Sequence, residues 1–243
     1  MATVRIDLEY DGSGFSGWAA QPGLRTVQGE LEDALRTILH AEVGLSVAGR
    51  TDAGVHAWGQ VASFDAPGEL PDDLGQRLNG VLAEDVAVTA AAAAPEGFDA
   101  RRSARSRTYC YQLLARPAPS PFERGRALWW PHRLDHRLLE RCAALLPGSH
   151  DFTAFTPTDT EHVRFEREVL RAEWARDGEL ACFWIEADAF MRNLVRVLLG
   201  TMLEVASGRR EVGSLAELLA GAPRSQAGET APAHGLYLAS VRY

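Results

Sequence analysis

Apolar and polar residues alternate with a period of two at the start of the chain, which predicts a half-buried strand over residues 4–10. An apolar stripe at helical spacing begins after Thr26, which is a suitable N-cap, and predicts a helix. The pattern returns to short alternating runs and one further helical stripe. These predict strands at 45–48, 55–64 and 86–94 and a helix from about Pro71.

The first hundred residues therefore read β-α-β-β-α-β, the ferredoxin-like order that RNA-recognition modules also use. The second half repeats this order without repeating the sequence. Its predicted elements are strands at 109–114, 163–176, 179–188 and from Leu236, and helices from Asp135 to Pro147, from Phe190 to about Ala206 and near Leu215 to Leu219. We predict an α+β fold of two ferredoxin-like, RRM-like halves with a central cleft. The halves are residues 1–100 and residues 101–243, the latter with an insertion at 116–133.

Composition and charge describe an ordinary soluble protein. Of 243 residues, 46% are hydrophobic and 24% charged, and the formal net charge is −8, so no general coat of positive charge is available for nucleic acid. The three cysteines form no C-x-x-C pair, and no histidine spacing indicates a metal site. Without a leader or a spanning apolar run, we expect a cytoplasmic protein with no membrane contact.

The segment from Gly49 to His56 is the candidate centre of the chemistry. Its glycines place Asp52 at the tip of a tight loop between two strands, where little side-chain bulk would block a substrate. Arg50, two residues away, can share the face of Asp52 and favour the ionised carboxylate. The alternative is a hairpin with one capping aspartate and one solvated arginine.

Gly12, Gly14 and Gly17 satisfy the G-x-G-x-x-G spacing of a dinucleotide site, but the context argues against that function. The glycines of such a site open a helix, whose N-terminus holds the pyrophosphate. Here Trp18 and Pro22 continue the loop. We therefore expect no nucleotide cofactor at this position.

Basic residues in the second half provide candidate partners. Arg196 lies in a helix that is apolar most of the way round, and a buried guanidinium needs an anion, which Asp52 could supply. Alternatively, Arg192 and Arg196 line a narrow solvated edge. The run Arg101, Arg102, Arg105 and Arg107 leads into Tyr109, which suits a polyanion beside a stacked base, although a solvated charged face is the simpler interpretation.

Taken with these residues, the chain resembles the tRNA pseudouridine synthase A family over nearly its whole length. The motif from Ala48 to His56, which contains Arg50-Thr51-Asp52, is the most specific. The others are Tyr10-Asp11-Gly12-Ser13 with Gly17-Trp18, Thr26-Val27-Gln28, Phe98 with Ala100-Arg101, Arg107-Thr108-Tyr109, Val195-Arg196 with Gly200, and Gly235-Leu236-Tyr237-Leu238.

The resemblance implies a pseudouridine synthase-type body that isomerises uridine to pseudouridine at positions 38, 39 and 40 of the tRNA anticodon stem-loop. It implies Asp52 as the nucleophile, Arg196 as its ionic partner and Tyr109 over the target base. It also implies a homodimer that uses no cofactor or metal, and isomerisation requires neither redox chemistry nor phosphoryl transfer. Arg50, Arg101 and Arg107 are the further candidate substrate-binding residues.

Four positions depart from the family pattern: Ala19, Ala83, Asp99 and Val197. Asp99 replaces a usual histidine and adds negative charge beside the expected RNA surface. Two other classes of function stay open at this point, a noncatalytic RNA-binding protein and an aspartyl hydrolase of small molecules. The first predicts aromatic platforms on the sheets, and the second predicts a metal or a second carboxylate near Asp52.

Overall fold

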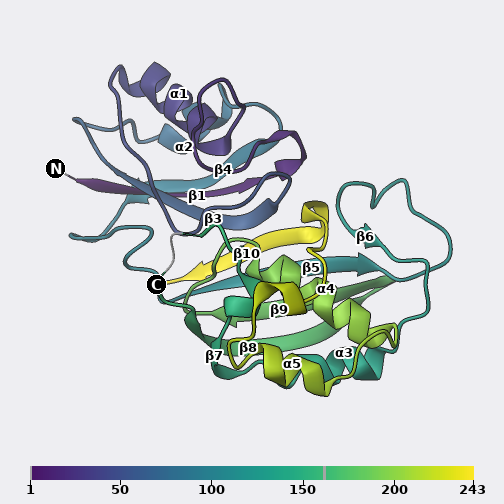
Figure 1. Ribbon diagram of the computed structural model, residues 1–243. Helices are drawn as coiled ribbons and strands as arrows, with labels where there is room; N and C mark the ends of the chain where they lie inside the picture. Colours follow the sequence, from purple (N-terminus) through teal and green to yellow (C-terminus); the bar gives the residue numbers. More distant parts are fainter. Residues whose placement is uncertain (1, 161–162) are drawn as a thin grey trace. The chain divides into compact units, whose positions relative to one another are not determined.

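A computed structural model describes residues 2–160 and 163–243 and has a mixed α+β fold, which confirms the predicted fold class. The chain forms two compact units, whose elements are labelled in Figure 1. Unit 1 comprises Met1–Arg107 and Tyr237–Tyr243, and unit 2 comprises Thr108–Leu236.

Unit 1 contains the predicted ferredoxin-like sheet. Its strands are β1 (Thr3–Tyr10), β2 (Ser46–Val47), β3 (His56–Asp65) and β4 (Val86–Ala93). The central strand β1 pairs antiparallel with both β3 and β4, and the short β2 pairs antiparallel with β3. Strands β4, β1 and β3 are adjacent in that order and β2 pairs with β3, as in the predicted ferredoxin-like arrangement.

The last strand, β10 (Leu236–Arg242), joins unit 1 although it lies at the far end of the sequence. It runs parallel to β3, with Tyr237 opposite His56. The two strands approach closely, because a Cβ atom on Gly59 would lie 2.6 Å from the carbonyl oxygen of Ala239. The sequence pattern predicts these residues as part of the second half of the chain, whereas this pairing places them beside the Asp52 segment.

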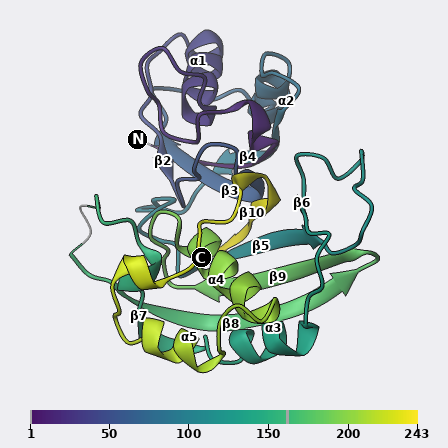
Figure 2. The same cartoon turned by 45° about the vertical axis from the view of Figure 1, so that its right-hand side comes forward.

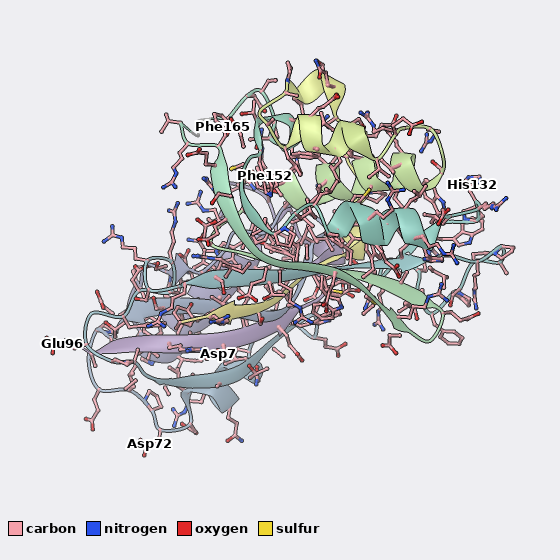
Figure 3. All side chains as sticks on the ribbon, turned by 90° about the horizontal axis from the view of Figure 1, so that it is seen from below. Asp7, Asp72, Glu96, His132, Phe152 and Phe165 are labelled. Atoms are coloured by element: carbon pink, nitrogen blue, oxygen red, sulfur yellow. The ribbon has the colours of Figure 1, made fainter. Side chains whose placement is uncertain are left out.

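Two helices complete unit 1, α1 (Val27–Leu39) and α2 (Leu74–Asn79). Thr26 caps α1 as expected, since its side chain accepts a hydrogen bond from the backbone of Gly29 at 3.2 Å. Alternate β1 side chains, among them Ile6 and Leu8, are fully buried. Asp7, labelled in Figure 3, alternates with them and therefore lies on the opposite face of the sheet.

The strands of unit 2 follow the order β5-β9-β8-β7, with β6 paired to β5. The strands are β5 (Ser106–Leu114), β6 (Leu128–Trp129), β7 (Gly148–Asp151), β8 (Glu166–Asp177) and β9 (Leu180–Ala187). The β8–β9 hairpin is the one predicted across Asp177-Gly178. Its pairing ends at Asp177 and Leu180, so its two-residue loop lies one position later than predicted.

The helices of unit 2 are α3 (His136–Ala143), α4 (Leu194–Ala206) and α5 (Gly213–Leu218), shown again in Figure 2. The apolar pattern predicts that the α4 helix begins at Phe190, and this start is wrong. Asn193 has a left-handed backbone with φ of 63°, so the regular helix cannot extend before Leu194.

Short 3-10 helices lie at η1 (Gly12–Gly14), η2 (Thr153–Phe155), η3 (Arg224–Gln226) and η4 (Ala233–Gly235). Within residues 2–160 and 163–243, no helix is both long and apolar enough to cross a membrane.

Candidate active site

Asp52 opens a tight turn in the segment between β2 and β3. The backbone N–H of Val55 donates to the carbonyl oxygen of Asp52 at 3.1 Å, and Gly54 in this turn has φ of 77°. A positive φ at this position is what a type II turn requires, and glycine adopts it without strain. The side chain of Asp52 is half-buried and that of Arg50 is exposed.

The glycines of the Gly12–Gly17 segment allow the chain to approach this turn closely. A Cβ atom on Gly12 would lie 2.0 Å from the carbonyl oxygen of Val55, and one on Gly17 would lie 2.9 Å from that of Thr51. The neighbouring Trp18 N–H donates to the same Thr51 oxygen at 3.0 Å. These glycines therefore accommodate the Asp52 loop, which accounts for a spacing that otherwise resembles a phosphate-binding motif.

Buried polar side chains fix the loop from beneath. Tyr10 and Thr51 share a hydrogen bond of 2.7 Å between their hydroxyl groups, next to Asp52 in the sequence. The Gln60 side chain donates to the Tyr10 hydroxyl at 3.2 Å and to the Gly49 carbonyl oxygen at 2.7 Å. Burial raises the pKa of Tyr10 to about 12, against the smaller opposing effects of the Thr51 and Gln60 hydrogen bonds, so its hydroxyl stays protonated at neutral pH.

His56 supports the same region and is itself buried, with 2% of its surface exposed. Its Nδ1 accepts a hydrogen bond from the Gly12 N–H at 3.0 Å and lies 3.1 Å from Oδ1 of Asp11. Its ring stacks on Tyr237 with 4.6 Å between centroids, and Trp58 stacks on that tyrosine at 4.2 Å. These contacts hold the end of the loop against β10 and η1.

Arg107 connects the root of the Asp52 loop with the arginine-rich segment. Its Nε and Nη2 donate to the carbonyl oxygen of Ala48 at 2.9 and 2.8 Å. Its Nη2 also donates to the Arg101 carbonyl oxygen at 2.8 Å, and Nη1 to that of Ala104 at 3.2 Å. With these four hydrogen bonds, the Arg107 guanidinium joins Ala48, which precedes the Asp52 loop, to the segment that contains Arg101 and Ala104. Arg101 itself lies in an exposed turn of unit 1.

Arg196 and Tyr109 both belong to unit 2. The Arg196 guanidinium, which is half-buried, donates through Nε to the Ala231 carbonyl oxygen at 2.8 Å and through Nη1 to Oδ1 of Asn193 at 2.9 Å. The Tyr109 ring is 7% exposed and meets the edge of Phe190, with 4.9 Å between centroids. Both side chains are thus held in defined orientations within their own unit.

The structure brings four of the sequence-predicted residues, Asp52, Arg50, Arg101 and Arg107, into unit 1. The sequence reasoning gave no role to Tyr10 and Gln60, which hold the Asp52 loop, because a buried tyrosine or glutamine in a strand gives no chemical signal. Asn193 was missed too, although an asparagine just before an apolar helix is a recognisable capping position.

Comparisons with known proteins identify the family of the chain. A family model described as tRNA pseudouridine synthase matches residues 142–243. The tRNA pseudouridine synthase A of Frankia casuarinae is 45% identical over 100% of this chain and 90% of the relative. The protein of the same name from Streptomyces griseus is 46% identical over 99% and 87%, and that of Geobacillus kaustophilus is 39% identical over 99% and 94%.

Among solved structures, a chain of the archaeal box H/ACA sRNP Nop10–Cbf5 complex aligns with 84% of this chain and 42% of its own length, at 12% identity and a TM-score of 0.37. The inference of family rests instead on the sequence relatives, which match along the whole chain at well over 30% identity. The chain therefore belongs to the tRNA pseudouridine synthase A family.

Proposed function

We propose that the protein is a tRNA pseudouridine synthase that isomerises uridine to pseudouridine at positions 38, 39 and 40 of the anticodon stem-loop. The observation that carries this proposal is the full-length similarity to relatives that bear the name tRNA pseudouridine synthase A. The Asp52 turn adds support, because it presents a carboxylate on a short loop fixed from several sides.

The proposed chemistry needs one nucleophile and no net change in composition. The bond between N1 and C1′ of the uridine breaks, the base turns, and a bond between C5 and C1′ forms. C5 loses its proton and N1 ends protonated, so atoms and electrons balance. In this proposal the ionised carboxylate of Asp52 is the covalent catalyst. A rigid loop favours such a role, since misplacing a nucleophile by a fraction of an ångström slows the reaction.

The same proposal gives roles to two side chains of unit 2. Arg196 is the ionic partner of Asp52, and Tyr109 holds the target base after it leaves its stack. The fixed orientation of the Arg196 guanidinium, which Ala231 and Asn193 hold, supports the first role. The edge-on contact with Phe190, which steadies the Tyr109 ring, supports the second.

Arg50 and Arg101 are proposed to bind RNA phosphates, and their exposed side chains support this. For Arg107 the observed hydrogen bonds support a different contribution. Its guanidinium already serves three carbonyl oxygens, so we propose that it acts on the substrate indirectly by holding the Arg101 turn against Ala48. A homodimer in the cytoplasm completes the proposal.

Replacement of the nucleophile tests the function. Asp52→Asn should keep the fold and tRNA binding, because an amide is nearly isosteric with a carboxylate, while turnover falls at least about a thousandfold. The measurement is pseudouridine formation in unmodified tRNA, together with tRNA affinity.

Asp65→Asn is the matched control. Asp65 lies at the exposed end of β3, where its Oδ1 accepts a hydrogen bond from the Thr3 hydroxyl at 2.9 Å, and an amide oxygen can still accept it. This variant should retain wild-type turnover. Near wild-type pseudouridine formation by Asp52→Asn would remove Asp52 from the role of nucleophile. A wild-type protein that binds tRNA without modifying it would point to the noncatalytic alternative.

A further inference from the structure

Asp99 organises the backbone of the arginine-rich segment of unit 1. Its Oδ1 accepts hydrogen bonds from the backbone N–H groups of Arg101 at 2.9 Å and Arg102 at 2.7 Å. In return the Asp99 N–H donates to the Ser103 hydroxyl at 3.0 Å, and the Ser103 N–H donates to the Asp99 carbonyl oxygen at 2.9 Å. These four bonds close a single helical turn, with Asp99 in the place of an N-cap.

This Asp99–Ser103 turn is fastened to the sheet at Ala100, which is fully buried and packs against Ala48 and Val61. The Ala100 N–H donates to the Ser63 hydroxyl at 2.9 Å, and the Tyr243 hydroxyl donates to the Ala100 carbonyl oxygen at 2.9 Å. The backbone of the turn is therefore held by β3 and by the residue that follows β10, and it packs against Ala48, which precedes the Asp52 loop.

Arg101 and Arg102 lie within this turn, between Ala100 and Ser103. Both side chains are exposed, and neither forms a hydrogen bond or an ion pair with any residue among 2–160 and 163–243. Two other arginines of unit 1 behave differently, since Arg5 pairs with Asp7 and Arg25 pairs with Asp85, each at 2.6 Å. The turn thus displays two adjacent positive charges on a rigid base.

The negative charge of Asp99 is stabilised by hydrogen bonds from the turn and its surroundings. Burial acts to raise the pKa of its carboxyl group, but the hydrogen bonds from the Arg102 backbone, the Ser46 side chain and the Arg101 backbone, with the charge of Arg102, outweigh burial and lower it. The carboxylate is therefore ionised and directed at backbone donors.

We propose that Asp99 is a positioning residue for substrate binding: its carboxylate fixes the turn from which Arg101 and Arg102 bind the RNA backbone. The inference rests on the proposed function. If the negative charge of Asp99 simply repelled RNA, removal of its side chain would raise tRNA affinity. The proposal predicts that the same removal lowers tRNA affinity. A fixed turn increases affinity because the backbone of the two arginines loses little conformational freedom on binding.

Two substitutions at one position separate these effects. Asp99→Ala removes the cap, and tRNA affinity should fall about fivefold, the size of a lost N-cap, while the slope of log affinity against log salt becomes shallower by about one phosphate contact. Asp99→Asn keeps an oxygen that accepts both N–H groups but removes the charge. Its affinity should equal or exceed that of the wild type, with an unchanged salt slope.

Asp135→Ala is the matched control, because Asp135 caps α3 in unit 2 through the same kind of bond, from the backbone N–H of Arg137 at 2.9 Å. It should lower thermal stability as Asp99→Ala does while leaving tRNA affinity and its salt slope unchanged. An equal rise in affinity for Asp99→Ala and Asp99→Asn would overturn the proposal in favour of simple repulsion. So would a loss of stability in Asp99→Ala with wild-type affinity and slope.

An assay of pseudouridine formation by the wild-type protein distinguishes failure of the Asp99 role from failure of the proposed function. If the wild type modifies tRNA and Asp99→Ala binds it normally, only the role of Asp99 fails. If the wild type neither binds nor modifies tRNA, the proposed function fails and the role of Asp99 fails with it.

Discussion

The glycines and buried polar residues around Asp52 show that residues without a catalytic group determine the position of the loop that carries it. Gly12 and Gly17 satisfy a phosphate-binding spacing, yet the space that they leave is filled by the backbone of Thr51 and Val55. The local motif in a single sequence is enough to nominate Asp52 as the candidate nucleophile. It does not reveal which distant backbone lies against a glycine, because that depends on tertiary packing.

Tyr10 provides a test at this scale. Tyr10→Phe removes the hydroxyl that joins Thr51 and Gln60, so two buried polar groups lose a partner, at a cost of about 1–3 kcal/mol in the free energy of unfolding. We also expect kcat to fall several-fold with little change in KM, because the loss loosens the residue that precedes Asp52. Steady-state kinetics and denaturant unfolding are the measurements.

The pH dependence of stability gives the same substitution a second readout. Burial raises the pKa of Tyr10 in the folded protein to about 12, above its ordinary value of 10.0. The contribution of Tyr10 to the free energy of unfolding is therefore full below pH 10 and is lost as pH rises towards 12. Tyr10→Phe should therefore lose less stability over this interval than the wild type does. Thr156→Val, which removes a buried hydrogen bond to Phe152 in unit 2, is the control and should leave kcat unchanged. A wild-type kcat in Tyr10→Phe would contradict the role of Tyr10 in holding the loop.

At the scale of elements, periodicity predicted the long helices and strands, and local backbone conformation decided their ends. The apolar stripe of α1 and its N-cap at Thr26 could be predicted because both signals are local in the sequence. The start of α4 was not, since Phe190 and Met191 continue the apolar pattern while Asn193 adopts a left-handed conformation. The two-residue strand β6 is similarly too short for periodicity, and only its pairing with β5 defines it, whereas β2 lies within the strand predicted at 45–48.

Asn193 tests whether this helix start serves Arg196. Asn193→Gly tolerates the φ of 63° and should leave unfolding free energy almost unchanged, but it removes the oxygen that accepts from Arg196 Nη1. We expect kcat to fall about three- to tenfold. Asn193→Ala removes the same oxygen and adds left-handed strain of about 1–2 kcal/mol, so it should lose activity equally and stability more. Wild-type kcat in Asn193→Gly would show that the bond to Asn193 is dispensable for Arg196.

At the scale of the whole molecule, unit 1 is discontinuous in sequence. The pairing of β10 with β3 is parallel and joins Tyr237 to His56, which are far apart in the sequence, so no local pattern predicts it. Charge shows a similar contrast between the whole and its parts. The net charge of −8 argues against nonspecific binding of nucleic acid, yet Arg101 and Arg102 stand together on a fixed turn.

Subunit association is the remaining prediction at this scale. In the 116–133 insertion of unit 2, Phe122 is 84% exposed and Trp129 is 41% exposed, and large apolar side chains gathered on one segment favour burial against a partner. A second subunit would also double the number of arginine turns offered to one polyanionic substrate. We therefore expect sedimentation at working concentration to give about twice the chain mass of 26.5 kDa.

The insertion supplies a direct test of where the subunits meet. Phe122→Ser combined with Trp129→Ser should shift the mass towards the monomer and weaken tRNA binding, because the two arginine turns then act separately. Leu24→Ser is the control, since Leu24 is 51% exposed in unit 1, outside the insertion, and its loss should leave the mass unchanged. A double variant that stays at twice the chain mass would place the interface elsewhere on the surface. A wild-type monomer that still modifies tRNA would refute dimerisation as a requirement and leave the chemistry of Asp52 untouched.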